Sequence, residues 1–119
     1  MRKTEFDLEE RTAKFAEDSR DYFNKLPKTQ SNLKYADQGI RSTGSTAGNY
    51  IEANEALSKK DFYMRIKICK KEAKETLYWL ELLGKTIDDE GLKQECRALW
   101  SEAKEFVLIF GKIVSKNKV

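Results

Sequence analysis

The chain has 119 residues, of which 36% are charged and one is proline, and its formal net charge is +3. This length suffices for one sizeable core, so we predict that residues 1–119 form a single domain. No apolar run is long enough to span a membrane, and the first ten residues lack the apolar region of a secretion signal. We expect a cytoplasmic protein without membrane contact, less basic overall than a dedicated nucleic-acid binder.

The sequence contains no histidine. This excludes the commonest general base, the serine–histidine arrangement of many hydrolases and every imidazole metal ligand. Neither a phosphate loop nor a dinucleotide-binding glycine fingerprint occurs. Cys69 and Cys96 fall on apolar helix faces, which favours small buried side chains over a disulfide or redox pair. We therefore expect no enzymatic activity and no cofactor.

The first of four segments with helical periodicity ends at Leu26, because the residue before Pro27 avoids the helical conformation. Thr4 or Asp7 is its expected N-cap. Its core stripe consists of Leu8, Thr12, Phe15, Ser19, Tyr22 and Leu26. A short loop through residues 27–29 follows.

The second helix is predicted over residues 31–54, with Ser31 as its N-cap. The face expected to meet the core carries Leu33, Ala36, Ile40, Thr43, Ala47, Tyr50 and Ile51. The opposite face carries Gln38, Arg41, Ser42, Ser45, Asn49 and Glu52. Amides and hydroxyls predominate there instead of lysine and glutamate, which suits hydrogen bonds to another protein surface or a ligand.

Three glycines interrupt this helix, and each costs about 0.8–1 kcal/mol relative to alanine. They are Gly39, Gly44 and Gly48. The last two lie one turn apart, so the missing side chains favour the close approach of another backbone. The alternative is that the helix kinks or frays near Gly44.

The third helix is predicted to begin at the N-cap Ser58, with Asp61 in its first turn, and to end at Gly84 as a C-terminal glycine. Its core stripe consists of Phe62, Ile66, Cys69, Ala73, Leu77 and Leu80.

The fourth helix is expected to follow Asp88 or Asp89, and residues 115–119 are expected to fray. Its core stripe consists of Leu92, Cys96, Leu99, Ala103, Phe106, Phe110 and Ile113. Four amphipathic helices with short connections predict an all-α protein, an antiparallel up-down-up-down four-helix bundle.

The third helix carries a second apolar face, about 100–160° around its axis from the core stripe. That face consists of Met64, Ile68, Trp79 and Leu82, and the fourth helix adds Trp100, Val107 and Ile109 outside its stripe. Large apolar residues clustered outside a core are typical of an interaction surface, here self-association. The alternative is a wide stripe that reaches into the corners of the bundle.

A basic row with interleaved tyrosines also follows the third helix. It consists of Lys60, Tyr63, Lys67, Lys70, Lys71, Lys74 and Tyr78. Cations and aromatic rings pair phosphates and stack bases in proteins that bind single-stranded RNA. The alternative is a solvated face, because Glu72, Glu75 and Glu81 lie on the same helix. In a ring of identical subunits the fields of such rows would add.

Two pairs of glutamates are spaced three residues apart, Glu52 with Glu55 and Glu72 with Glu75. Four carboxylates on two neighbouring helices would suit Mg²⁺ in a nucleotide hydrolase. Such spacings also arise by chance in a sequence this charged.

The polar pattern of the second helix is carried by Gln38, Arg41, Ser45, Asn49 and Glu52. It resembles the signature helix of a bacterial four-helix-bundle family related to the protein encoded by intervening sequences in large-subunit ribosomal RNA genes. Residues 71–83, KEAKETLYWLELL, resemble the third-helix signature of one branch, and the Leu26-Pro27 step also fits. Ala53 departs from the glycine that many members carry after the glutamate.

The resemblance implies a homo-oligomer, typically a pentameric ring, and a link to RNA or the ribosome. We therefore predict a non-enzymatic helical-bundle protein whose partners are further copies of itself and RNA. The alternatives are a protein-interaction scaffold and a Mg²⁺-dependent nucleotide hydrolase. The candidate interface consists of Gln38, Arg41, Ser45, Asn49, Glu52, Met64, Ile68, Trp79 and Leu82.

Overall fold

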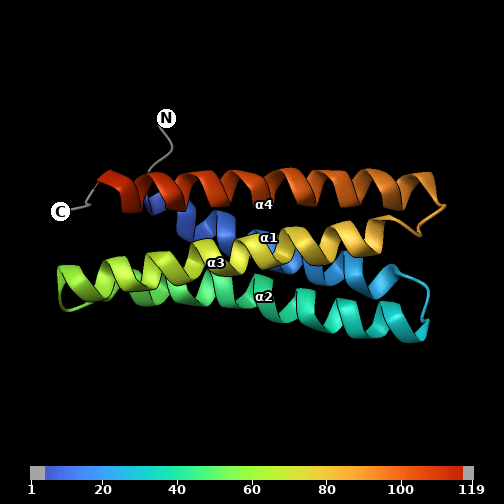
Figure 1. Cartoon of the computed structure of the whole chain (residues 1–119), viewed down its shortest axis with the longest axis horizontal. Helices are drawn as coiled ribbons and strands as arrows, with labels where there is room; N and C mark the ends of the chain where they lie inside the picture. Colours follow the sequence, from blue (N-terminus) through green and yellow to red (C-terminus); the bar gives the residue numbers. More distant parts are fainter. Residues whose placement is uncertain (1–4, 117–119) are drawn as a thin grey trace.

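The computed structural model describes residues 5–116, with side chains from residue 8 onward. Its helices are α1 (Glu5–Lys25), α2 (Gln30–Asn54), α3 (Lys59–Gly84) and α4 (Glu90–Lys116). Successive helices run in opposite directions along the same long axis (Figure 1). Close backbone contacts join α1 to α2, α2 to α3, α3 to α4 and α4 back to α1, and none joins a diagonal pair within the described residues. The predicted antiparallel four-helix bundle is confirmed.

Side-chain caps fix where the helices begin. Thr29 accepts a hydrogen bond from the backbone N–H of Asn32 at 3.1 Å, so α2 starts at Gln30 and the predicted cap Ser31 is wrong. A threonine side chain before the first helical residue satisfies one of the N–H groups that the first turn leaves unpaired. Thr4 and the side chain of Asp7 lie outside the described residues.

The other two caps agree with the sequence. Ser58 accepts from the N–H of Asp61 at 3.0 Å, and Asp89 accepts from that of Leu92 at 3.3 Å. The end of α3 differs from expectation, because Gly84 has no positive φ and so does not form a left-handed C-cap. Residues 115 and 116 continue α4, and the rest of the tail that was expected to fray lies outside the described residues.

Aromatic rings fill the space between α1 and α4, the adjacent pair whose backbones approach least closely. Phe106 of α4 is fully buried, with its ring centroid 5.3 Å from that of Phe15 and 6.0 Å from that of Phe110. At the surface of this seam, Arg11 lies over the Phe106 ring and binds Glu102 at 2.7 Å. The predicted core stripe of α1 is buried throughout.

The core face of α2 differs from the prediction. Leu33, Ile40 and Ile51 are 54%, 38% and 47% exposed, so their assignment to the core is wrong. The other four predicted residues are buried as expected: Ala36, Thr43, Ala47 and Tyr50. Four further residues of α2 are buried that were not assigned to the core: Gly39, Ser42, Thr46 and Ala53. Small side chains face inward because α2 packs closely against both neighbours. The buried hydroxyls find acceptors in the turn before them, as in the 2.8 Å bond from Thr46 to the carbonyl of Ser42.

The three glycines of α2 have different environments. A Cβ on Gly39 would lie 2.4 Å from the Phe23 ring, so this position must lack a side chain for α1 and α2 to pack. A Cβ on Gly44 or Gly48 would meet nothing within 4 Å. The helix continues unbroken through both positions, so the alternative of fraying near Gly44 does not apply.

We expect Gly39→Ala to lower the free energy of unfolding by about 1–3 kcal/mol, because the Phe23 ring must move out of a close-packed site. Gly44→Ala is the matched control, because it occupies open space in the same helix and should raise stability by about 0.5–1 kcal/mol. Urea titrations followed by circular dichroism on the two variants would measure both changes. Equal effects would contradict the contact with Phe23.

Cys69 and Cys96 are free and buried, as expected. Burial raises the pKa of the Cys69 thiol to about 12, and burial also raises the pKa of Cys96. Both side chains therefore remain neutral thiols at physiological pH and serve as small core residues. None of the helices within residues 5–116 is long and apolar enough to cross a membrane.

Candidate functional site

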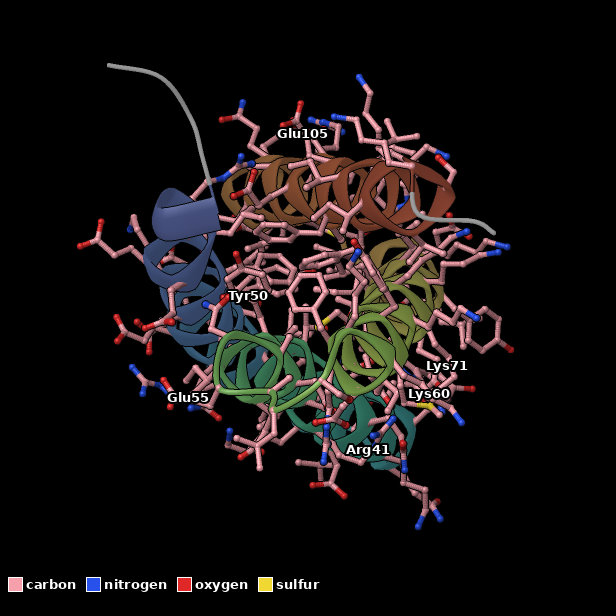
Figure 2. The ribbon with its side chains drawn as sticks, turned by 90° about the vertical axis from the view of Figure 1, so that its left-hand side faces the viewer. Arg41, Tyr50, Glu55, Lys60, Lys71 and Glu105 are labelled. Carbon is pink, nitrogen blue, oxygen red and sulfur yellow. The ribbon has the colours of Figure 1, made fainter. Side chains whose placement is uncertain are left out.

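The predicted basic row lies on the outer side of α3, away from the core. We call these seven residues the basic ridge: Lys60, Tyr63, Lys67, Lys70, Lys71, Lys74 and Tyr78. Tyr63 and Lys70 are half-buried and the other five are exposed. Lys60 and Lys71 project from the same side of the bundle, opposite Glu55 (Figure 2). At 1.5 Å of rise per residue, Lys60 to Lys74 spans about 21 Å.

Three of the four acidic residues of α3 have partners on neighbouring helices. Arg41 of α2 binds Glu72 at 3.2 Å and Glu75 at 2.7 Å, and Glu81 accepts a hydrogen bond from the indole of Trp100 at 2.9 Å. Within the part of the chain that the structure describes, the five ridge lysines make no ion pair. The lysines of the ridge are therefore not neutralised by direct ion pairs, and Glu81 is the acidic side chain that shares the line of Lys67 and Lys74 along the helix.

Helix α4 extends the positive surface, which the sequence reasoning missed. Arg97 and Lys104 of α4 are exposed. The end of the Lys70 side chain reaches within 3.6 Å of where a Cβ on Gly111 would lie, so the ridge continues onto α4. Arg97 and Lys104 are seven residues apart and so share one face of α4, and this spacing is the signal that could have found them.

The polar residues of α2 are largely engaged inside the chain. Besides the ion pairs of Arg41, Asn49 accepts a hydrogen bond from Arg65 of α3 at 3.0 Å and donates one to the carbonyl of Ser45 at 2.9 Å. Gln38 accepts from Arg41 at 3.3 Å. Ser42, expected on this open face, is buried and bonded to Thr76 at 2.7 Å. The main role of these side chains in the structure is to hold α2 against α3.

The structure brings the second apolar face of α3 next to this polar seam. Met64 is 54% exposed, while Ile68, Trp79 and Leu82 are half-buried. The Trp79 ring stacks on Tyr35 of α2, with centroids 6.0 Å apart. Its indole N–H is buried and has no acceptor among the described residues. The two halves of the candidate interface therefore form one continuous surface across α2 and α3.

On α4 the corresponding prediction is wrong. Trp100, Val107 and Ile109 are half-buried and pack against the core, as the alternative of a wide stripe proposed. The core stripe of α4 therefore reaches further around the helix than its heptad positions.

The four glutamates considered for Mg²⁺ do not form a site. Arg41 already forms ion pairs with the carboxylates of Glu72 and Glu75, and both glutamates lie on α3. Among residues 8–116, no three histidine, cysteine or acidic side chains are grouped so that they could hold a metal ion.

Comparison with known proteins places this arrangement in a family. Residues 4–107 match the family described as 23S rRNA-intervening sequence protein. The chain belongs to this family. A crystal structure of a protein of unknown function from the S23 ribosomal protein family of Bacteroides thetaiotaomicron is similar, with a TM-score of 0.78 and 28% identity. The similarity covers 90% of this chain and 97% of that one. No curated protein matches significantly.

Membership of the 23S rRNA-intervening sequence protein family confirms the resemblance seen in the signature residues of the second and third helices. Both descriptions connect the family with ribosomal RNA or the ribosome. The solved relative shares the helical fold over nearly its whole length.

Proposed function

We propose that this protein is a non-enzymatic, homo-oligomeric RNA-binding protein, assembled as a pentameric ring, that binds RNA along the basic ridge. The observation that carries the proposal is that the five ridge lysines make no ion pair among the described residues, while Arg41 binds Glu72 and Glu75. The family's link to ribosomal RNA supports RNA as the ligand. A reducing cytoplasm suits the two free cysteines.

The ridge offers two kinds of contact to RNA. Its lysines, with Lys104 and Arg97 of α4, pair phosphates and release counterions, which makes binding salt-dependent. Tyr78 is exposed beside Lys74 and can stack on an unpaired base. In a ring, identical ridges add their fields and raise the affinity for a long RNA.

The test is a triple charge reversal of Lys67, Lys71 and Lys74 to glutamate. We expect its affinity for a labelled single-stranded or hairpin RNA to fall at least about 100-fold. The slope of log K against log salt should also fall by about 2, at roughly 0.7 for each lost phosphate contact. Fluorescence anisotropy at several KCl concentrations measures both quantities.

The matched control reverses three exposed lysines away from the ridge, Lys14, Lys28 and Lys34, and changes the net charge equally. It should retain most of the affinity. Equal losses in the two triple variants would show that only net charge matters. Unchanged binding in the ridge variant would reject the ridge, and absence of RNA binding in an assembled wild type would favour the scaffold alternative.

A further inference from the structure

The line of lysines along the outer side of α3 ends at Lys74. Lys67 and Lys74 are seven residues apart, and the next position on the same line is Glu81. The Glu81 carboxylate accepts a hydrogen bond from the neutral indole of Trp100, and no cation pairs with it among the described residues. A phosphate backbone that continued straight along α3 would meet this carboxylate, and like charges repel.

Helix α4 offers positive charge where the line on α3 ends. Three of its four acidic residues bind cations of α1, and the fourth lies in the first turn of α4. The first three are Glu95, Glu102 and Glu105, and the fourth is Glu90. Arg97 and Lys104 are exposed and make no ion pair within the described part of the chain. Both cations are therefore available to an anionic ligand.

The contact between Lys70 and Gly111 fixes where these cations lie relative to the ridge. The Lys70 amine is 3.6 Å from where a Cβ on Gly111 would lie, and α3 and α4 are antiparallel (Figure 1). Lys104, seven residues before Gly111, is therefore about 4.5 Å beyond the level of Lys74. Arg97 comes seven residues further, near the end of α3. At 100° per residue, both cations lie within about 40° of Gly111 around α4.

We propose that one unpaired RNA strand follows the basic ridge along α3 and crosses to Lys104 and Arg97 of α4 before it reaches Glu81. This inference rests on the proposed RNA-binding function and names the class of RNA and its path. From the level of Lys60 to that of Arg97 the path spans about 36 Å, on a molecule whose long axis is 46 Å. At a rise of about 3.4 Å for each stacked nucleotide, this length corresponds to about ten nucleotides.

Tyr78 gives the path its preference for unpaired RNA. Its ring is 54% exposed and lies one turn beyond Lys74, at the level where the strand crosses to α4. The Trp79 ring, with its centroid 5.0 Å away, supports it from one side. An unpaired base can turn a free face to this ring, whereas a base inside a duplex is stacked on both faces. A duplex would therefore leave Tyr78 without a partner.

The path is tested with labelled single strands of about 5 and about 12 nucleotides, of which only the longer one reaches α4. Arg97→Glu combined with Lys104→Glu should weaken binding of the longer strand at least about 10-fold. It should also lower the slope of log K against log salt for that strand by about 1.4, and change the affinity for the shorter strand by less than about 3-fold. Fluorescence anisotropy measures all three, and circular dichroism checks the fold.

The matched control for the path combines Lys28→Glu with Lys34→Glu, which changes the net charge equally at exposed positions outside α3 and α4. It should retain the wild-type affinity for both strands to within about 3-fold. Equal losses for both strands in the α4 variant, or no loss for either, would overturn the crossing and leave RNA binding by the basic ridge in place.

The class of RNA is tested with the longer strand and a duplex of the same sequence. The wild type should bind the single strand more tightly. Tyr78→Ala should weaken that binding about 10-fold without changing the affinity for the duplex, whereas Tyr78→Phe keeps the ring and should bind like the wild type. Tighter binding of the duplex, or equal affinities of the Ala and Phe variants for the strand, would overturn the preference for unpaired RNA. A wild type that binds neither RNA would overturn the proposed function and this inference with it.

Discussion

Replacing Phe106 with alanine is expected to lower the free energy of unfolding by about 3–5 kcal/mol. The ring is fully buried between Phe15 and Phe110, under the guanidinium of Arg11. It fills the seam between α1 and α4, the adjacent pair whose backbones approach least closely, so neighbouring side chains cannot close the cavity that alanine leaves. Urea unfolding at pH 7, followed by circular dichroism, measures the change.

Leu108→Ala is the matched control, because Leu108 lies on the same helix and is exposed. It should change the stability by less than about 0.5 kcal/mol. If Phe106→Ala lowers the free energy of unfolding by less than about 1.5 kcal/mol, neighbouring side chains have closed the cavity. That result would contradict close packing of the Phe106 ring in the seam.

Arg41→Ala is expected to cost about 2–3 kcal/mol of stability. The Glu72 side chain is 8% exposed, and removing its cation leaves a buried carboxylate without compensation, for which losses of about 3–5 kcal/mol are typical. The Arg41 guanidinium is half-exposed, so solvent screens the ion pair and the expected loss of stability is smaller than this. If Arg41 served only to contact a partner, its removal would leave the stability unchanged.

A double-mutant cycle with Glu72→Gln isolates the pair. The double variant should be more stable than the sum of the single losses implies, because glutamine leaves no charge to compensate. Glu75→Gln is the control and should cost less than about 1 kcal/mol, since that side chain is 40% exposed. Additive losses for Arg41 and Glu72 would contradict a direct coupling.

Much of the fold could be predicted because three helices bury large apolar side chains at regular spacing. The stripe of α1, for example, is buried as its periodicity predicts. The second helix was harder to interpret, because its core face is made of glycine, serine, threonine and alanine. Hydropathy assigns Leu33 and Ile40 to the core, whereas close helix packing and hydroxyl bonds to the preceding turn select Gly39 and Thr46.

The exposure of four of the five ridge lysines follows from their spacing along one helix. The orientation of Glu72 and Glu75 does not, since it depends on Arg41 from another helix. Whether Lys104 extends the basic ridge depends on how α3 and α4 are aligned along their axes. A single sequence does not specify that alignment. Contacts between helices are therefore what sequence reasoning missed at the candidate site.

The loose seam between α1 and α4 has a consequence for how the molecule opens. Because α1 approaches its neighbours less closely than α2 and α3 approach each other, it is the element whose detachment disturbs the fewest contacts. Amide hydrogens of α1 should then exchange through partial openings that leave the other three helices in place. Such an opening exposes the phenylalanine rings of the seam to solvent. We therefore expect another chain to associate at this seam and aggregation to begin there.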